Sequence, residues 1–327
     1  MVTTAGCRGG HSGEGVVFVI WCRSKQSQTA MAAPSTVIKF VRTQGLCILK
    51  QLRLEESLFR VSNDNWVIAN DGTDKTAIVL GISGKPHHLI DVQRAYEDNI
   101  LTIKRYTGGG TVVVDKDTQF VSFILNGNTI PHIQLFPVPL MRWTSKVYKG
   151  DYSTSNDSRK HSGGVFRDVP TWHVHQNDYV IGGVNDDDDG NNSQKLKVGG
   201  NAQSISKHRF THHTSFLWAF SPENMRYLKL PKKQPEYRAN RPHGAFLAPL
   251  CEYLPERGAM FDRLPEALTN AIENVTIEMC SLSDAEKAAS SCDSGKPSTA
   301  HRSTAVVDLE KALSLDYDAR APVLREE

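Results

Sequence analysis

The stretch IKRYTGGGTVVVD, residues 103–115, combines the features of a sheet with those of an anion-binding loop. Apolar and β-branched residues run into it over 100–103 and leave it over 111–114, so we expect a strand on each side. Between these strands lie three consecutive glycines, Gly108, Gly109 and Gly110. Glycines cost backbone entropy, but they let bare N–H groups line a concavity and approach an anion closely.

Two cations, Lys104 and Arg105, come directly before the glycines. The planar guanidinium of Arg105 suits a phosphate or a carboxylate, because it donates two parallel hydrogen bonds. The pattern therefore predicts an anion site. The alternative is a tight hairpin with a basic residue that happens to lie beside it.

The composition is that of an ordinary globular protein. The chain has 327 residues, of which 39% are hydrophobic and 23% charged, enough for one large domain or two smaller ones. A net charge of +2 gives no general attraction to nucleic acid or membrane, so neither is expected as a partner. The six cysteines form no CxxC pair, which favours reduced thiols over disulfides or a zinc site.

Residues 1–35 differ from the rest of the chain. Glu14 is the only acidic residue before Glu55, while arginine, lysine, serine, threonine, glycine and alanine are frequent. This composition is typical of an organellar transit segment and suggests a mitochondrial or plastid protein. The alternatives are an unstructured tail of a cytoplasmic protein, or an upstream extension with the real start at Met31.

Residues 36–255 carry the periodicities of a mixed α/β domain. Strands are expected at 38–41, 65–70, 76–80, 120–126, 178–181 and 209–218. Helices are expected at 46–60, 90–98 and 141–148. Residues 256–280 are expected to form a C-terminal amphipathic helix, and 281–327 a largely disordered tail with a short helical piece near 306–315.

A second lysine and glycine cluster occurs in LKVGGNAQ, residues 196–203. Lys197 alone is more typical of a protein surface, but its position beside Gly199 and Gly200 indicates a site residue. The adjacent His212 and His213 point to opposite faces of their expected strand, so we expect them to pack or to form hydrogen bonds rather than to share a metal.

Two other segments were considered for binding. GISGKP, residues 81–86, lacks the spacing of a phosphate loop, and Pro86 stands where a magnesium-binding hydroxyl is needed, so we exclude a phosphate loop. Residues 222–246 carry six basic side chains against two acidic ones, an excess that would attract an acidic partner. A solvated linker is the alternative.

The segment KRYTGGGTVVVD, residues 104–115, resembles the RRxxGGGxVxxD signature of the lipoate–protein ligase A family, and KVGGNAQ, residues 197–203, resembles its KxxGxA segment. The flanking sequences, among them HHTSFLW at 212–218, are similar to a plant-type eukaryotic subgroup of lipoate ligase-like proteins. The resemblance covers about residues 37–255. It implies the biotin/lipoate ligase catalytic-domain fold, an α/β (α+β) architecture with a central mixed sheet flanked by helices.

The resemblance also implies a reaction. Lipoate, or octanoate, would react with ATP in the presence of Mg²⁺ to give an acyl-adenylate. The acyl group would then pass to a lysine of a lipoyl carrier domain, either in an E2 subunit of a 2-oxoacid dehydrogenase or in the glycine cleavage H protein. The resemblance identifies no magnesium ligand in this chain.

The matching motif positions assign roles to individual residues. Lys197 corresponds to the catalytic lysine, which bridges the acyl carboxylate and the α-phosphate. Binding of substrate and adenylate is assigned to Lys104, Arg105, Gly108, Gly109, Gly110, Asp115, Gly200, Asn201 and Ala202. Three positions depart from the family pattern: Lys104 replaces the first arginine, Val114 a frequent histidine, and Ile82 a frequent arginine.

Two alternatives stay open from the sequence. An octanoyl or lipoyl transferase on the same fold would work without ATP. However, such enzymes use a cysteine, residues 165–179 contain none, and Cys251 lies outside the matching motif. A non-catalytic acyl- or nucleotide-binding relative is the other alternative, because of the three departures. Biotin ligation is disfavoured, since the arginine-rich GRGRxGR loop is absent.

Overall fold

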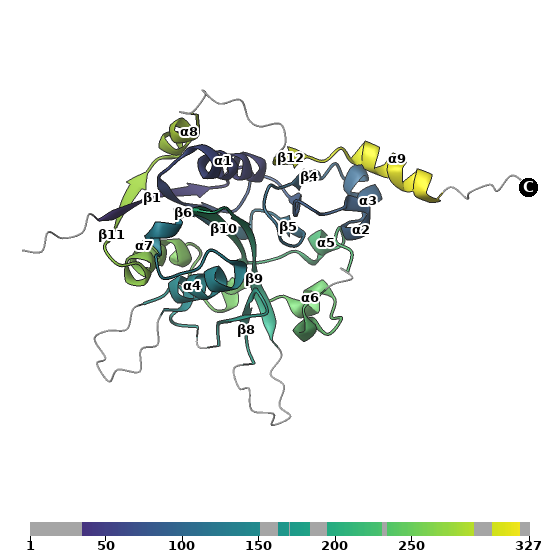
Figure 1. Cartoon of the computed structure of the whole chain (residues 1–327). Helices are drawn as coiled ribbons and strands as arrows, with labels where there is room; N and C mark the ends of the chain where they lie inside the picture. Colours follow the sequence, from purple (N-terminus) through teal and green to yellow (C-terminus); the bar gives the residue numbers. More distant parts are fainter. Residues whose placement is uncertain are drawn as a thin grey trace, which may run out of the picture. The chain divides into compact units, whose positions relative to one another are not determined.

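The computed structural model describes residues 35–150, 163–169, 171–183, 195–230, 234–290 and 303–320, which all belong to one unit, Ser35–Glu327 (Figure 1). Residues 1–34 of the expected transit-like segment lie outside the described residues. No helix among those described is long and apolar enough to cross a bilayer.

An eight-stranded mixed sheet runs through the centre of this unit, in the order β11-β1-β2-β6-β10-β9-β8-β7. Strand β1 pairs in parallel with both β11 and β2, and the remaining neighbours are antiparallel. The strands are β1 (Thr36–Gln44), β2 (Asn65–Asp71), β6 (Thr118–Asn126), β7 (His173–His175), β8 (Asp178–Ile181), β9 (Leu196–Ile205), β10 (Arg209–Leu217) and β11 (Val275–Cys280). The predicted fold class, a central mixed sheet flanked by helices, is confirmed.

A second sheet of four short strands carries the glycine loop, in the order β12-β4-β3-β5. Its strands are β3 (Ala77–Leu80), β4 (Leu101–Lys104), β5 (Val112–Val114) and β12 (Ala305–Val306). Strands β3 and β4 are parallel, and α2 (Pro86–Leu89) and α3 (Val92–Glu97) lie in the connection between them. The glycine loop joins β4 to β5 across β3, so the two predicted strands exist but do not form a hairpin with each other.

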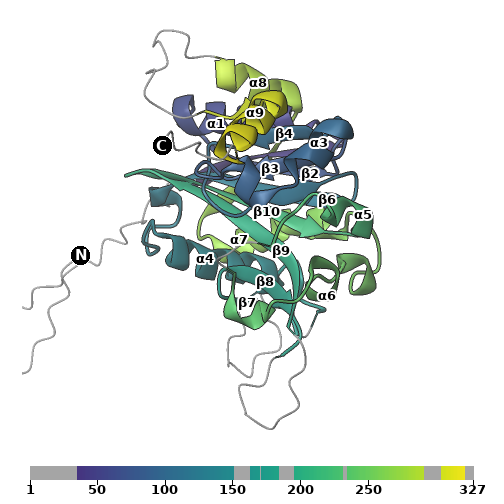
Figure 2. The same ribbon diagram turned by 90° about the vertical axis from the view of Figure 1, so that its right-hand side faces the viewer.

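The helices cover both faces of the large sheet because its strands alternate in the side chains they bury. In β2, Val67 and Ala69 join a core with α4 (Pro137–Lys149) and α7 (Ala259–Ala271). On the opposite face, Trp66 and Ile68 join a core with α1 (Ile48–Val61) and α8 (Leu282–Ser290). Figures 1 and 2 show these two helix layers. The remaining helices are α5 (Pro222–Met225), α6 (His243–Phe246) and α9 (Leu309–Arg320).

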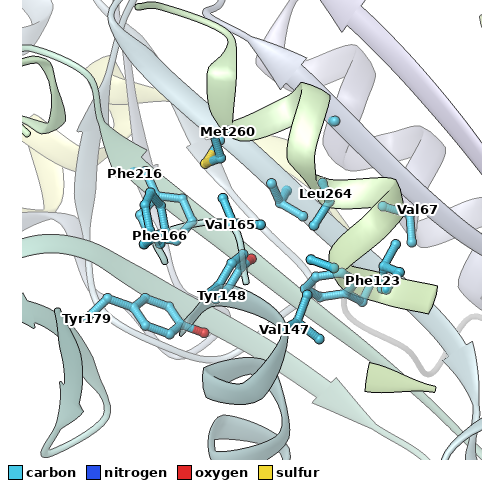
Figure 3. Packing of buried hydrophobic residues seen from close by; sticks show 14 of the residues in the cluster. Val67, Phe123, Val147, Tyr148, Val165, Phe166, Tyr179, Phe216, Met260 and Leu264 are labelled. Carbon is cyan, nitrogen blue, oxygen red and sulfur yellow. The ribbon is translucent and has the colours of Figure 1, made fainter. Parts of the chain in front are cut away.

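An aromatic cluster around Tyr148 of α4 lies in the core that α4 and α7 cover (Figure 3). The Tyr148 ring is fully buried, and the centroids of its nearest aromatic neighbours, Phe216 and Tyr179, lie 5.0 and 5.2 Å away at nearly perpendicular angles. Its hydroxyl donates a hydrogen bond of 3.1 Å to Thr214 Oγ1 on β10. This cluster fixes α4 against the strand that carries His212 and His213.

The C-terminal region differs from the expectation in two places. The helix expected over 256–280 ends at Ala271, because Asn274 adopts a left-handed conformation (φ 52°) that turns the chain into strand β11. The alternating VTIEMC pattern of β11 then pairs with β1 at the edge of the large sheet.

The tail after residue 281 contains ordered elements where disorder was expected. Helix α8 begins with a capping box, in which Ser281 and Asp284 each accept a hydrogen bond from the backbone N–H of the other. Ala285 of this helix is buried against the core that α1 covers. Strand β12 and helix α9 follow, while residues 291–302 lie outside the described residues.

The Tyr148 cluster predicts how two substitutions differ in stability. Tyr148→Ala should lower the free energy of unfolding by about 3 to 5 kcal/mol, because it leaves a ring-sized cavity. Tyr148→Phe should cost only about 1 kcal/mol, since it removes one hydrogen bond. Urea denaturation of both variants measures the difference. Equal costs would show that the hydroxyl, not the ring, carries the stabilisation.

Candidate active site

A cavity of about 1230 Å³ lies where the two sheets and α1 meet. Its apolar wall comes from α1, β3, β5 and β6, and its polar wall from β9, β10 and the glycine loop. The apolar lining residues are Ile48, Leu52, Val79, Leu89, Val112, Val114, Phe120, Ala202, Leu228 and Phe246. The site is therefore large enough for an extended apolar chain together with a polar group.

Arg105 lies in the wall of this cavity and shapes the glycine loop. Its side chain is only 4% exposed, and its guanidinium donates to Thr107 Oγ1 at 2.9 Å and to the carbonyl oxygens of Gly108 and Gly110 at 3.1 and 2.8 Å. Burial lowers the pKa of Arg105 to about 10, so the group stays charged at neutral pH. Among the described residues no carboxylate pairs with it.

The glycine loop touches the second motif directly. The Gly108 N–H donates to the Gln203 carbonyl on β9 at 3.1 Å. Gly109 has φ 107°, and a Cβ added there would lie 2.9 Å from the Asn201 carbonyl oxygen and 2.8 Å from Arg105 Nη2. A Cβ on Gly81 would lie only 2.2 Å from the Gly109 carbonyl oxygen. The loop therefore needs glycine at position 109 for both its conformation and its close packing.

Lys197 projects into the cavity from β9. Its Nζ lies 2.7 Å from Oδ1 of Asp178, on the neighbouring strand β8, and the hydroxyl of Tyr237 donates to Asp178 Oδ2 at 2.9 Å. Asp178 is the one carboxylate among the described residues that line the cavity. Sequence analysis identified Asp178 only as the start of a strand; no local pattern tied it to a lysine nineteen positions later.

Seven of the ten predicted site residues line the cavity, namely Arg105, Gly109, Gly110, Lys197, Gly200, Asn201 and Ala202. The other three do not. Lys104 ends β4 and pairs through its backbone with Leu80 and Ala305. Gly108 holds the loop against β9 through the hydrogen bond from its N–H to the Gln203 carbonyl. The Asp115 carboxylate accepts hydrogen bonds from the Asp117 N–H and the Asn224 amide, and so fixes the turn after β5.

A buried polar group lies behind the cavity wall. His213, which lines the cavity, places Nδ1 at 3.0 Å from Glu55 Oε2 of α1. Ser122 and Gln51 donate to Glu55 Oε1 at 2.6 and 2.8 Å. Burial alone would raise the pKa of Glu55, but His213 and these hydrogen bonds hold the pKa below its usual value. With Nδ1 directed at the carboxylate, Nε2 of His213 is left for the cavity.

His212 faces the other side of the sheet, as predicted from its position beside His213. Its ring contacts the Tyr179 hydroxyl at 2.9 Å and the Gln203 amide at 3.0 Å. Burial and the neighbouring His213 lower the pKa of His212 to about 3, so the ring is neutral at pH 7. The expectation of a packing, hydrogen-bonding histidine is confirmed. No cluster of three or more metal-ligating side chains occurs in the described part of the chain.

Basic side chains surround the cavity. Five lysine and arginine residues line it, namely Lys85, Arg105, Lys197, Lys229 and Arg238. Lys85 belongs to the GISGKP segment, which thus contributes to the site although it is not a phosphate loop. With five cations and one carboxylate in its described lining, the cavity favours an anionic ligand.

Arg238 is a buried cation whose guanidinium lies 4.8 Å from the Phe246 ring centroid and donates to the Arg241 carbonyl through Nε. Its side chain is 5% exposed, and its Nη2 has no hydrogen-bond partner among the described residues. Its neighbours Ala239 and Asn240 both adopt left-handed backbone conformations (φ 48° and 58°), which strain a non-glycine residue. Thr111 and Gln234 also line the cavity. Each has a buried side-chain oxygen that has no hydrogen-bond partner among the residues that the structure describes.

The basic stretch 222–246 contributes side chains to the fold and to the cavity lining. Its excess of positive charge alone suggests only an acidic partner or a solvated linker. Arg226 pairs with Asp98 at 2.8 Å, and Arg241 donates to the carbonyl oxygens of Lys195 and Tyr237. Lys232 and Lys233 lie outside the described residues.

The loop geometry predicts different effects for two neighbouring glycines. Gly109→Ala should lower the free energy of unfolding by about 2 kcal/mol or more, because of its positive φ and the adjacent backbone oxygen. Gly110→Ala is the matched control, since a Cβ there meets nothing within 4 Å, and should change stability by about 0.5 kcal/mol or less. Urea denaturation compares them. Equal stabilities would contradict the close packing at Gly109.

The lowered pKa of Glu55 predicts that the stability difference between wild type and Glu55→Gln depends on pH. Because its pKa in the folded protein lies below the ordinary value of 4.5, the carboxylate stabilises the fold above that pH. This stabilisation is lost as the pH falls through the lowered pKa. Glu55→Gln should therefore cost about 2 kcal/mol at pH 7 and progressively less below about pH 4.5. Urea denaturation at several pH values measures this, with the exposed Glu252→Gln as control. A difference that does not change with pH would contradict the assignment.

Comparison with known proteins agrees with this fold. Residues 48–273 match the family described as the lipoyl protein ligase A/B catalytic domain. A Plasmodium falciparum protein named inactive lipoate–protein ligase 2 is 32% identical over 243 residues, 64% of this chain and 62% of that protein. The match therefore spans less than two thirds of that relative's length.

Solved structures share the fold at low sequence identity. The bipartite lipoate protein ligase of Thermoplasma acidophilum, studied with its E2 lipoyl domain, is 14% identical with a TM-score of 0.55 over 78% of this chain and 91% of its own. A lipoate–protein ligase A bound with ATP is 13% identical with a TM-score of 0.54 over 79% and 93%. The family match covers more than half of the sequence, and the chain belongs to the lipoyl protein ligase A/B catalytic-domain family.

Proposed function

We propose that this chain is a lipoate–protein ligase, which activates lipoate or octanoate with ATP and passes the acyl group to a lysine of a lipoyl carrier domain. The observation that carries the proposal is the convergence of five basic side chains on a cavity with an apolar wall. An acyl-adenylate has both matching parts, an apolar chain and an anionic phosphate.

Uncompensated charge in the wall supports an anionic ligand. A buried cation without a paired anion is costly, and Arg105 and Arg238 both lie buried at the cavity without a carboxylate partner among the described residues. The adenylate phosphate would supply the missing charge. The glycine loop would hold the adenylate through backbone groups, since Gly109 and Gly110 carry no side chain between the backbone and the cavity.

In the first step, an oxygen of the lipoate carboxylate attacks the α-phosphorus of ATP. A bond between acyl oxygen and phosphorus forms, the bond to the β-phosphate bridging oxygen breaks, and pyrophosphate leaves. Lys197 would lie between carboxylate and phosphate, where its charge offsets the developing negative charge. Asp178 keeps the Lys197 ammonium aimed into the cavity through their 2.7 Å ion pair.

In the second step, the amine of the carrier lysine attacks the acyl carbonyl. An amide bond forms, the bond between the carbonyl carbon and the adenylate oxygen breaks, AMP leaves and the amine releases its protons. Lys197 would polarise the carbonyl during this attack. The apolar side chains of α1, β3 and β5 would hold the acyl chain, with Nε2 of His213 available as a polar contact.

Magnesium fits this site as a partner of the triphosphate. Mg²⁺ in nucleotide sites is usually held by one or two carboxylates together with phosphate oxygens. Asp178 is the one carboxylate in the described lining, and its two oxygens already bind Lys197 and Tyr237, so the phosphate oxygens would be the main ligands of the ion. When bound, the ion would offset the charge of the triphosphate.

A specific observation favours a second candidate, a non-catalytic acyl- or nucleotide-binding protein. The Plasmodium falciparum relative bears the word inactive in its name. By contrast, transfer through a cysteine is disfavoured, because the described cysteines, Cys47, Cys251 and Cys280, are not among the residues that line the cavity.

Lipoyl domains of E2 subunits or the glycine cleavage H protein are the partners that this reaction requires. The Thermoplasma acidophilum ligase was studied with its E2 lipoyl domain, which supports this class of partner. Such carriers and the composition of residues 1–35 together suggest a mitochondrion or plastid as the compartment.

Lipoate-dependent exchange of pyrophosphate into ATP tests the proposal. Wild-type protein should catalyse the exchange, and Lys197→Ala should lose at least about 100-fold, because the group between the two anions is gone. Lys207→Ala, an exposed lysine beyond the end of β9, is the control and should keep full activity.

Two outcomes would favour the alternatives. Acyl transfer from an octanoyl carrier to a lipoyl domain, without any exchange, would replace the ligase with a transferase. Folded protein that binds an acyl-adenylate analogue but is silent in both assays would identify a binding protein.

A further inference from the structure

The C-terminal segment returns to the site from the far end of the chain. Strand β12 lies beside β4 in Figure 1 and pairs antiparallel with it. Ala305 lies opposite Lys104, at the beginning of the glycine loop. The N–H of Val307 extends this pairing with a 2.8 Å hydrogen bond to the Thr102 carbonyl. The segment therefore covers the edge of the small sheet on which the glycine loop is mounted.

Thr304, directly before β12, makes two buried hydrogen bonds to residues about 200 or more positions away. Its Oγ1 accepts from the Tyr106 N–H at 3.2 Å, and its own N–H donates to Glu56 Oε2 at 2.8 Å. Thr304 is 6% exposed. Since a buried N–H without an acceptor is costly, Tyr106 depends on Thr304 for its backbone hydrogen bond.

The two partners of Thr304 lie on two elements that contribute other residues to the cavity lining, the glycine loop and α1. Tyr106 follows Arg105 in the glycine loop, and its hydroxyl donates to Thr211 on β10 at 3.1 Å. Glu56 follows Glu55 on α1 and holds Arg60 through its other oxygen at 2.8 Å. Thr304 thus links the helix behind the cavity wall to the loop that carries Arg105.

Helix α9 anchors the segment. Leu309, Ala312 and Leu313 pack against the core that contains Ile78 and Leu80 of β3. Helix α9 also contacts α3, which lies beside it in Figure 1. The position of Thr304 is therefore set by the pairing of β12 with β4 and by the packing of α9, and not by its two hydrogen bonds alone.

We propose that Thr304 is a positioning residue of the active site. It holds the backbone at Tyr106 so that the Arg105 guanidinium and the glycines face the cavity. The segment Thr304–Leu313 then supports the glycine loop from outside the cavity lining, although it begins almost 200 residues beyond the glycine motif. The effect on the loop is independent of the proposed function, whereas the effect on ligand binding rests on it.

Hydrogen exchange of the full-length protein, read by mass spectrometry, tests the effect on the loop. Thr304→Val removes the acceptor of the Tyr106 N–H with little change in volume, and should speed exchange in peptides that cover residues 106–111 by about 10-fold. Thr304→Ser keeps the hydroxyl and should restore the wild-type rate. Ser303→Ala, an exposed hydroxyl in the same segment, is the matched control.

A second variant covers the case in which Thr304→Val does not fold. Leu309→Ala weakens the anchor of α9 without removing a hydrogen bond of Thr304, and should speed exchange in the same peptides to a smaller degree. Unchanged exchange over 106–111 in the folded variants would overturn the proposal.

Binding of a lipoyl-adenylate analogue with a sulfamate in place of the phosphate tests the consequence for the site. The dissociation constant should rise about 10-fold in Thr304→Val and recover in Thr304→Ser, while the thermal midpoint of Thr304→Val falls by only a few degrees. Equal affinity in wild type and Thr304→Val would show that the loop does not need this residue to bind. If wild type fails to bind the analogue, the proposed function fails, and the exchange experiment still decides the role of Thr304.

Discussion

The active site depends on the backbone contact between the glycine loop and β9. Gly108 donates to the Gln203 carbonyl, and Gly109 lies so close to the Asn201 carbonyl that no side chain fits between them. This contact brings Arg105 and Lys197, 92 positions apart in sequence, into the wall of one cavity. The two sheets meet here, and the space they leave beside α1 is the cavity. Glycine is needed at this point because two backbones approach each other, and the same lack of side chains leaves N–H groups accessible to a ligand.

The charged side chains in and behind the cavity wall are of two kinds. Some are paired with an opposite charge or fully hydrogen-bonded, and others lack an anionic partner among the described residues. Lys197 is paired with Asp178, and the Glu55 carboxylate is satisfied by His213, Ser122 and Gln51. Arg105 is hydrogen-bonded only to neutral oxygens, and one nitrogen of Arg238 has no partner among the described residues. Groups of the first kind are held in place before a ligand arrives. Those of the second kind gain most when an anion binds, because they have already lost their hydration.

The sequence allowed prediction of most strands and of the two glycine motifs, because these signals are local. Alternation marks the strands, and consecutive glycines beside a cation mark the loop. The partners across the fold were not predictable in this way. In the sequence, Asp178 is only an acidic residue at the start of a strand, and the pairing of β8 with β9 brings it to Lys197. Arg238 is one of several basic residues in its stretch, and only the structure shows that Arg226 and Arg241 bind other groups. In the tail, α9 agrees with the helical piece predicted near 306–315, but α8 and β12 were missed for a different reason. The composition there is polar, so hydrophobic periodicity gave no signal, although the capping box of Ser281 and Asp284 did mark the start of α8.

The three departures from the family motif differ in what they remove from the cavity wall. Lys104 ends β4 and does not line the cavity, so the loss of the arginine fork there removes no donor from the wall. Ile82 acts through its backbone N–H, which donates to the Thr107 carbonyl, a contact that any residue except proline can make. Val114 does line the cavity, but as part of its apolar wall. Lys104 keeps a positive charge but lies outside the cavity lining, whereas Ile82 and Val114 lack the arginine and the histidine that the family often carries there. The charge available to an anionic ligand therefore comes from the five cations of the described lining, of which Arg105 and Lys197 are the two that the motifs predicted.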